Sequence, residues 1–267
     1  MRTIIILVFI FTGLSSFAGN NDSLDIFKEF IRVCNAYKQL PLQLSLEYKT
    51  MSNISISGED NKTTQAEFYI RKEGAYIRFG DAEQLITDSM VLVIMNNLKQ
   101  MMISENNMDI SVQMKIMMGP SVEDSAIQKM AGNYAVNKKL LDDGRAVIEI
   151  ADRKNLLGTS VPVESTMLTY NILGNVPENI LTTRRSLIST SRLPAISGKN
   201  EPGIQKITIP GKGDFYIKED IISYDYKKID HDANLRLPVL IKDRIIMDKD
   251  NNLMPVKAFE TYTLIKN

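Results

Sequence analysis

The chain has 267 residues, with 32 basic and 32 acidic side chains, so its net charge is zero. A balanced charge gives no reason to expect nucleic acid or an acidic macromolecule as a partner. The single cysteine, Cys34, excludes an internal disulfide, so the fold must be stabilised by its core alone. We interpret Cys34 as a small apolar residue on a helix, and a reactive thiol is the alternative.

The first eighteen residues have the three parts of a secretory signal peptide. Arg2 supplies a positive charge, residues 4–11 are apolar, and Ser16 and Ala18 are small residues at positions −3 and −1 of a cleavage site. The alternative is a membrane anchor, but this run is too short to cross roughly 30 Å of hydrocarbon as a helix of about 20 residues. No cysteine follows the run, so we expect a soluble periplasmic protein without a lipid anchor, cleaved near Ala18.

An amphipathic helix is predicted at the start of the mature chain. Leu24, Phe27, Ile31 and Cys34 recur at spacings of three and four, which places them on one apolar stripe. Pro41 prevents continuation of the helix because it lacks an N–H group. The period then changes to two, and residues 42–48 predict a strand with one buried face.

Strand-like segments make up most of the remaining chain. They are residues 68–71, 75–79, 84–87, 90–95, 98–103, 134–141, 146–150, 165–172, 180–188, 204–209, 221–226, 239–247 and 254–264. Two short helices are predicted at 109–118 and 121–130, and Gly144 predicts a hairpin turn after residue 141. We expect one mainly β domain over residues 19–267, with an insertion at about 190–235. Its meandering antiparallel sheet must curl or close at this size.

Residues that would carry catalysis are scarce. His231 is the only histidine, and with Asp230 and Asp232 it forms either a weak cation site or an exposed charged turn. Arg184 and Arg185 are adjacent, so on a strand they face opposite sides; either one of them points into a cavity or both are solvated. No catalytic triad or phosphate-binding loop is present, so we expect no catalytic residue, no metal, no cofactor and no enzymatic activity.

Methionine is the one unusual feature of the composition. The chain contains 14 methionines, many of them between Met90 and Met118. Methionine is unbranched and polarizable, so a surface lined by it suits flexible apolar ligands such as acyl chains. A core packed with methionine is the alternative. The absence of tryptophan argues against a platform on which sugars stack.

Residues 23–104 resemble the periplasmic outer-membrane lipoprotein carrier family and its lipoprotein-sorting relatives, called LolA-like. The segments that carry this resemblance are Tyr37-Lys38-Gln39-Leu40, residues 66–74, Tyr76-Ile77-Arg78-Phe79, residues 85–89, residues 91–96 and residues 98–101. Two departures stand out. Asp88 is followed by Ser89 rather than glycine, and Val93 and Met95 replace the aromatic residues usual in the following strand.

The resemblance implies a strongly curved antiparallel half-barrel with an N-terminal helix and a short helical insertion covering its concave face. It also implies an apolar cavity for lipid acyl chains. The side chains that we expect to line this cavity are Leu44, Leu46, Phe68, Ile77, Phe79, Val93, Met95, Met101, Met114, Met117 and Met118.

The function expected from these features is that of a soluble envelope carrier or sensor. It would bind lipid or lipoprotein acyl chains without bond chemistry and touch membranes at most peripherally. The alternative is a structural or protein-interaction module that holds an envelope protein partner. An enzyme, such as a hydrolase, is the third and least supported hypothesis.

Overall fold

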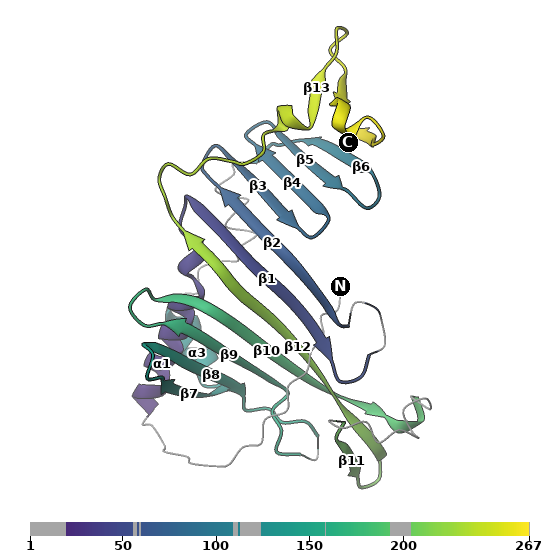
Figure 1. Ribbon diagram of the computed structural model, residues 1–267. Helices are drawn as coiled ribbons and strands as arrows, with labels where there is room; N and C mark the ends of the chain where they lie inside the picture. Colours follow the sequence, from purple (N-terminus) through teal and green to yellow (C-terminus); the bar gives the residue numbers. More distant parts are fainter. Residues whose placement is uncertain are drawn as a thin grey trace. The chain divides into compact units, whose positions relative to one another are not determined.

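The structure is a computed structural model that describes residues 20–55, 58, 60–108, 112, 124–157, 159–192 and 204–266 (Figure 1). The predicted signal peptide and three of the predicted cavity residues, Met114, Met117 and Met118, lie outside these ranges. Within them, no helix is long and apolar enough to cross a membrane.

The described chain is mainly β. Its α-helices are α1 (Asn20–Cys34) and α3 (Asp124–Ala131), and short 3-10 turns lie at Ala36–Lys38, Thr190–Arg192, Ile241–Asp243 and Lys257–Phe259. The strands are β1 (Leu42–Ser52), β2 (Lys62–Ile70), β3 (Gly74–Phe79), β4 (Ala82–Thr87), β5 (Met90–Met95), β6 (Gln100–Glu105), β7 (Tyr134–Leu140), β8 (Arg145–Asp152), β9 (Glu164–Asn171), β10 (Val176–Ser189), β11 (Lys206–Ile209), β12 (Gly213–Asp230), β13 (Ile245–Met247), β14 (Leu253–Pro255) and β15 (Thr263–Lys266).

Thirteen of the described strands form one sheet. Their order is β15-β6-β5-β4-β3-β2-β1-β12-β10-β9-β8-β7, with β11 paired to β12, while β13 and β14 pair only with each other. The neighbouring pairs from β2 to β6 and from β7 to β10, together with β10–β12 and β11–β12, are antiparallel, whereas β15 runs parallel to β6. The predicted mainly β fold with an N-terminal helix and an open antiparallel sheet is confirmed.

Two compact units make up the chain. Unit 1 contains residues 1–36, 48–63 and 122–225, and unit 2 contains residues 37–47, 64–121 and 226–267. Strand β12, within the range predicted as an insertion, is the longest described strand and contributes residues to both units. The single domain over residues 19–267 stays a prediction.

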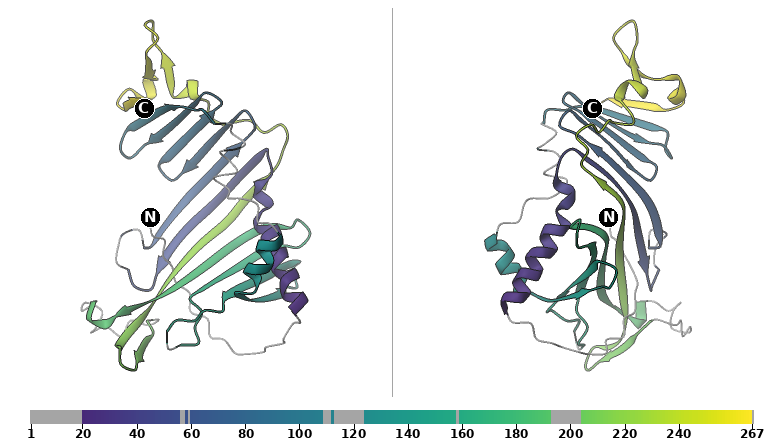
Figure 2. Two further views of the ribbon diagram at one scale, coloured as in Figure 1. Left: turned by 180° about the vertical axis from the view of Figure 1, so that it is seen from behind. Right: turned by 60° about the vertical axis from the view of Figure 1, so that its left-hand side comes forward.

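Helix α1 covers one face of the sheet of unit 1, and the views from two sides agree on this placement (Figure 2). Phe27 and Val33 of α1 are buried against Ile148 of β8 and Leu168 of β9, with Ile127 of α3 in the same cluster. The predicted stripe is confirmed, because Leu24, Phe30, Ile31 and Cys34 also pack on this core. Helix α3, the second of the two predicted helices, therefore lies on the α1 side of the sheet.

A partly buried carboxylate fastens α1 to the strands beneath it. Glu29 accepts a hydrogen bond from the Tyr170 hydroxyl at 2.6 Å and pairs with the Lys138 ammonium at 2.6 Å. Partial burial alone would raise the pKa of Glu29, but its hydrogen bonds from Lys138 and Tyr170 outweigh burial and lower it. The ionised form of Glu29 thus stabilises the contact between helix and sheet.

The C-terminal segment covers one face of the sheet of unit 2. Ile245, Phe259 and Leu264 pack there against a core that includes Leu92 of β5 and Met101 of β6. The continuous strands predicted at 239–247 and 254–264 are wrong, since only short strands and 3-10 turns form in these ranges. Their apolar residues pack onto the sheet, and the short strands that form pair as β13 with β14 and β15 with β6.

Polar contacts hold this cover in place. The Arg244 guanidinium forms an ion pair of 2.9 Å with Glu83 of β4 and lies 4.9 Å from the ring centre of Phe259. The Tyr262 hydroxyl donates a hydrogen bond to Asn96, whose amide in turn donates to Glu83. The contacts therefore join the C-terminal segment to β4 and to the turn after β5.

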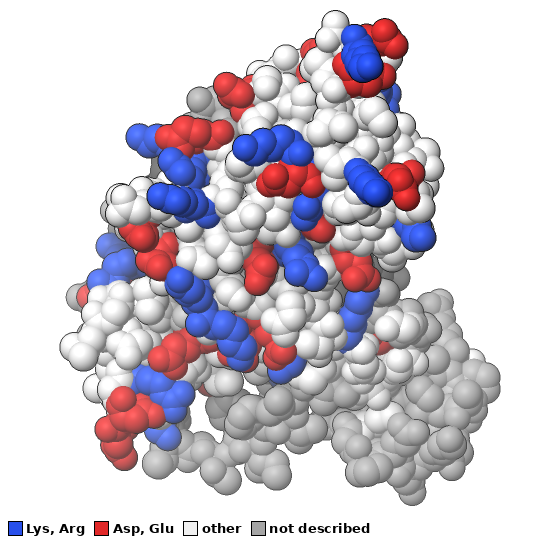
Figure 3. All heavy atoms as spheres, turned by 45° about the horizontal axis from the view of Figure 1, so that its top comes forward, with Lys and Arg blue, Asp and Glu red and all other residues white. Residues whose placement is uncertain are grey.

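Charges of both signs are interspersed on the face drawn in Figure 3. This distribution agrees with the zero net charge of the chain and shows no broad region of a single sign on that face. Long-range electrostatic steering of a charged macromolecule needs such a region. The surface in view thus gives no reason to revise the expectation drawn from composition.

Candidate functional site: a pocket on the free face of unit 1

A pocket of about 1260 Å³ lies within unit 1. Along β8, Ala146, Ile148 and Ile150 point into the core beneath α1, whereas Glu149 and Ala151 line the pocket. Successive side chains of a strand point to opposite faces, so the pocket is on the face that α1 leaves uncovered.

A row of small side chains explains why this face is hollow. The strand register places Ala135 of β7 beside Ala151 of β8, then Ser165 of β9, then Thr183 of β10. All four line the pocket. Small side chains on four neighbouring strands leave a depression where larger ones would fill the space above the sheet.

Larger apolar side chains form much of the pocket wall. Met167 and Leu181 stand in the next row of the sheet, and Val161, Pro162 and Ile217 complete the apolar part. Ligand pockets in proteins are commonly lined in this way, with mostly apolar walls and a few fixed polar groups. The pocket can accept a mainly apolar molecule.

The two adjacent arginines of β10 face opposite sides of the sheet, as their spacing predicted. Arg185 lines the pocket and forms an ion pair of 2.7 Å with Glu219 of β12, and both side chains are only 14% exposed. Arg185 also donates hydrogen bonds to the Pro162 carbonyl and the Ser165 hydroxyl. Arg184 is 60% exposed and pairs with Glu164 on the other side. Of the two alternatives left by the sequence, the default of two solvated arginines is wrong, because Arg185 lines the pocket.

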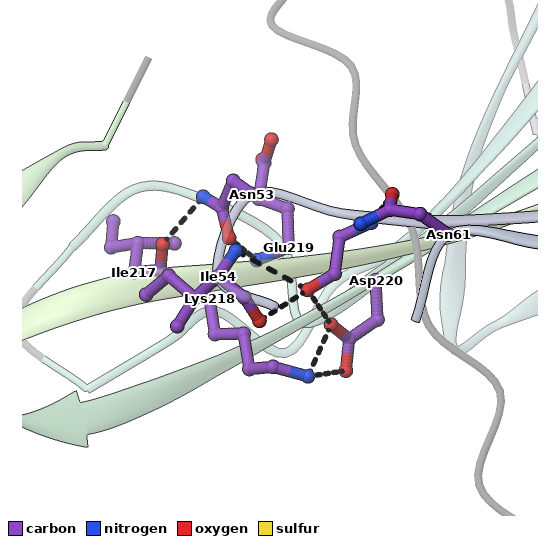
Figure 4. A network of polar contacts seen from close by, with 8 residues as sticks. Asn53, Ile54, Asn61, Ile217, Lys218, Glu219 and Asp220 are labelled. Carbon is purple, nitrogen blue, oxygen red and sulfur yellow. Dashed lines mark hydrogen bonds and ion pairs between the residues drawn. The ribbon is translucent and has the colours of Figure 1, made fainter. Parts of the chain in front are cut away.

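A polar network ties the end of β1 to the β12 wall of the pocket (Figure 4). The Asn53 side chain donates to the carbonyl of Ile217 and accepts from the backbone N–H of Glu219, both at 2.9 Å. Lys218 points to the opposite face and binds both carboxylate oxygens of Asp220, which also accepts from Ser52. Burial raises the pKa of Asp220 even though Lys218 is close. The network fixes the backbone that carries Ile217 and Glu219 into the pocket.

Glu149 is a carboxylate on the pocket floor for which the described residues provide no hydrogen-bond or ion-pair partner. Its carboxylate accepts no hydrogen bond and forms no ion pair within the described part of the chain. Burial raises the pKa of Glu149, and the nearby Arg185 only partly opposes this rise. Glu149 is half-buried and faces the pocket with a perturbed pKa, so it is a candidate for ligand contact.

Comparison with solved structures finds matches of low identity and low TM-score. An uncharacterized conserved protein from Thermus thermophilus is 9% identical, with a TM-score of 0.33 over 90% of this chain and 98% of that chain. A LolA superfamily protein from Nitrosomonas europaea is 12% identical, with a TM-score of 0.23 over 82% of this chain and 96% of that chain. A putative outer membrane lipoprotein-sorting protein domain from Vibrio parahaemolyticus is 11% identical, with a TM-score of 0.26 over 81% of this chain and 94% of that chain.

Comparisons of the sequence find less. No protein-family model matches the chain. No curated protein sequence matches it either.

The cavity residues predicted from the sequence belong to unit 2 wherever they are described, and none of them lines the pocket of unit 1. Five of them share one face of strands β2 to β5. The register aligns Phe68 with Ile77 and, across Gln84, with Val93. It aligns Phe79 with Met95 across Ala82. The structure thus brings these five side chains onto a common face, as an apolar surface requires.

The remaining predicted cavity residues are placed differently. Met101 pairs with Ile94 and is fully buried in the core beneath the C-terminal segment, so it lies on the opposite face from Val93. Leu44 and Leu46 are buried in β1. The pocket of unit 1 was not predicted from the sequence. Arg185 was the one residue of its lining that the sequence analysis named as a candidate for a cavity.

The other candidate residues show no reactive arrangement. Burial raises the pKa of the Cys34 thiol to about 12, which leaves almost no thiolate at neutral pH. His231 forms a hydrogen bond of 2.9 Å with the Pro41 carbonyl, and Asp230 pairs with Lys228. Across the described ranges, no three metal-binding side chains come together.

Proposed function

We propose that the protein is a carrier or sensor that binds lipid acyl chains in the pocket of unit 1. The observation that supports this most is the pocket itself, with about 1260 Å³ of space above a floor of small residues on the face that α1 leaves free. Typical small-molecule pockets occupy roughly 300–1,000 Å³. The larger volume favours a ligand with more than one acyl chain.

Binding of this kind needs no bond chemistry. Burial of apolar surface contributes about 25 cal/mol per Å², so an acyl chain along Met167, Leu181 and Ile217 is held by contact area alone. The apolar face of unit 2 that carries Phe68, Ile77 and Val93 is a second surface for acyl chains in this proposal. The predicted signal peptide supports a periplasmic site of action, and lipoprotein acyl chains are the expected cargo there.

Filling the pocket should remove the bound lipid. Ala151→Phe places an aromatic ring between Ala135 and Ser165, on the face away from α1. We expect purified wild-type protein to carry extractable lipid, seen by native mass spectrometry. The variant should bind a fluorescent fatty-acid probe at least about tenfold more weakly, a difference of roughly 1.4 kcal/mol.

Ala258→Phe is the matched control, because Ala258 is exposed and does not line the pocket. This control should bind the probe as the wild type does. Wild-type protein that neither carries lipid nor takes up the probe would refute the proposal. Equal binding by Ala151→Phe and the wild type would place the lipid elsewhere.

A protein-interaction role is the second candidate, and one surface favours it. Leu173, in the turn between β9 and β10, is 93% exposed, its neighbour Ile172 is exposed as well, and Leu140 is exposed at the end of β7. The backbone of Ile172 donates to the carbonyl of Gly144, which joins this turn to the β7–β8 turn. Exposed apolar residues that cluster in this way mark contact sites.

Replacing Leu173 tests that role. If a partner docks there, Leu173→Ser should abolish co-purification of one stoichiometric envelope protein from delipidated material. Leu157→Ser, at another exposed leucine of unit 1, should not change it. Loss of the partner from both variants, or from neither, would exclude this turn as the docking site.

A further inference from the structure

The described lining of the pocket contains three acidic and three basic side chains, and Glu149 is the acidic one on its floor that is not paired with a basic one. Arg185 and Glu219 neutralise each other at 2.7 Å, and the second carboxylate, Glu149, then has no cation of its own. Arg185 cannot serve both carboxylates through the same atoms, since its Nε is committed to Glu219 and its Nη1 to Pro162 and Ser165.

The elements packed around Glu149 supply no other cation at contact distance. Its cross-strand neighbours are Asn137 on β7 and Met167 on β9, which are both uncharged. Lys139 follows Asn137 as the next residue on the same face of β7, and no ion pair joins Lys139 to Glu149. No cation among the described residues pairs with Glu149. A ligand that enters the pocket can therefore balance its negative charge.

We infer that the pocket selects an aminolipid, an amphiphile whose acyl chains lie against the apolar wall and whose primary ammonium group binds the Glu149 carboxylate. This inference rests on the proposed function, since it assigns the head group of the same ligand. An ammonium group supplies N–H donors and a positive charge together, and charge-assisted hydrogen bonds are about twice as strong as neutral ones. Met167 and Leu181 continue from Glu149 along the same row of the floor, which provides the apolar path for the chain.

The burial of Glu149 gives this inference a second consequence. Because folding raises the pKa of this carboxyl group, the folded state disfavours its charged form, and the wild type loses stability as pH rises through the range between the ordinary and the raised value. Glu149→Gln should therefore raise the melting temperature at pH 8 and leave it unchanged well below the ordinary pKa, where the carboxyl is protonated in both states. An unoccupied site that costs stability is expected of a binding residue.

The test compares two soluble ligands with the same tail. Dodecylamine is cationic at pH 7, whereas dodecanol is uncharged, so the ratio of their dissociation constants isolates the head group. We expect delipidated wild-type protein to bind dodecylamine about tenfold more tightly, the factor that roughly 1.4 kcal/mol produces. In Glu149→Gln that ratio should fall to about one. In Glu178→Gln, which changes a carboxylate outside the pocket, it should stay near ten.

The outcomes separate the two proposals. Equal binding of both ligands to the wild type, or a preference that survives in Glu149→Gln, overturns the aminolipid assignment and leaves the carrier function standing. Failure of both ligands to bind overturns the carrier function itself. Recovery of phosphatidylethanolamine from wild-type protein, and its depletion in Glu149→Gln, would support the assignment with a natural aminolipid.

Discussion

Replacing Arg185 by leucine should reduce the free energy of unfolding by about 3–5 kcal/mol, because it leaves the carboxylate of Glu219 buried without its cation. Both side chains are only 14% exposed, and their ion pair is supported by hydrogen bonds from Arg185 to Pro162 and Ser165. Water cannot compensate fully for the lost partner at such a site. Urea denaturation followed by circular dichroism measures the change directly.

The neighbouring arginine is a close control. Arg184 pairs with Glu164 at the same 2.7 Å, but it is 60% exposed and faces the other side of the sheet. An exposed pair of this kind contributes roughly 0–1 kcal/mol. Arg184→Leu should therefore change the stability little. Equal effects of the two substitutions would show that burial of the Arg185 pair does not matter.

The double variant Arg185→Leu/Glu219→Leu should regain most of the lost stability. Removing both charges ends the penalty for an unpaired carboxylate, and buried ion pairs are often no better than apolar residues of similar size. A double variant that is as unstable as Arg185→Leu alone would mean that the hydrogen bonds to Pro162 and Ser165 dominate.

The second large effect concerns the attachment of α1. Glu29→Gln should lower the free energy of unfolding at pH 7 by about 2 kcal/mol, within the range of hydrogen bonds to charged groups. The amide can still accept from Tyr170, but it no longer pairs with Lys138, whose ammonium lies 2.6 Å from Glu29. Asp25→Asn, at an exposed carboxylate on the same helix, is the matched control and should stay within about 0.5 kcal/mol.

The advantage of Glu29 depends on pH in a defined direction. Its pKa is lowered in the folded state, so the stabilisation is present above the ordinary value of about 4.3 and is lost as pH falls through the lowered value. Burial lowers the pKa of Lys138, but its hydrogen bond to Glu29 raises this pKa by more, so the net change is a rise. The stabilisation is therefore also lost as pH rises through the raised pKa of Lys138. The difference between wild type and Glu29→Gln should be constant near neutral pH and disappear at both extremes. A difference that is independent of pH would contradict the assigned ion pair.

Sequence periodicity predicted the parts of the fold that are decided locally. The apolar stripe of α1 packs where it was expected, and Gly144 has the positive φ of 82° that the predicted hairpin turn requires. The segment after Val239 was predicted less well. Its apolar side chains pack onto the sheet of unit 2. Contacts between residues that are far apart in the sequence produce no regular period in it.

The pocket could not be predicted because register creates it. Ala135, Ala151, Ser165 and Thr183 are far apart in the sequence and unremarkable one by one. They form a hollow only because four strands align them in one row. The pair Arg184 and Arg185 was a partial indication, since adjacent residues of a strand face opposite sides, but the same spacing also fits two solvated arginines. The methionine-rich stretch directed attention to unit 2 instead.

The parallel pairing of β15 with β6 has a consequence for the biogenesis of the protein. During synthesis β6 emerges long before residues 263–266, which are to pair with it. Until they arrive, the outer backbone groups of β6 are an open template on which a strand of another chain can add. The nascent protein therefore passes through a stage in which it is prone to associate with other chains, and the folded protein does not share this property. A holding chaperone would be most needed at that stage, and the yield of monomer would depend on how quickly the last strand arrives.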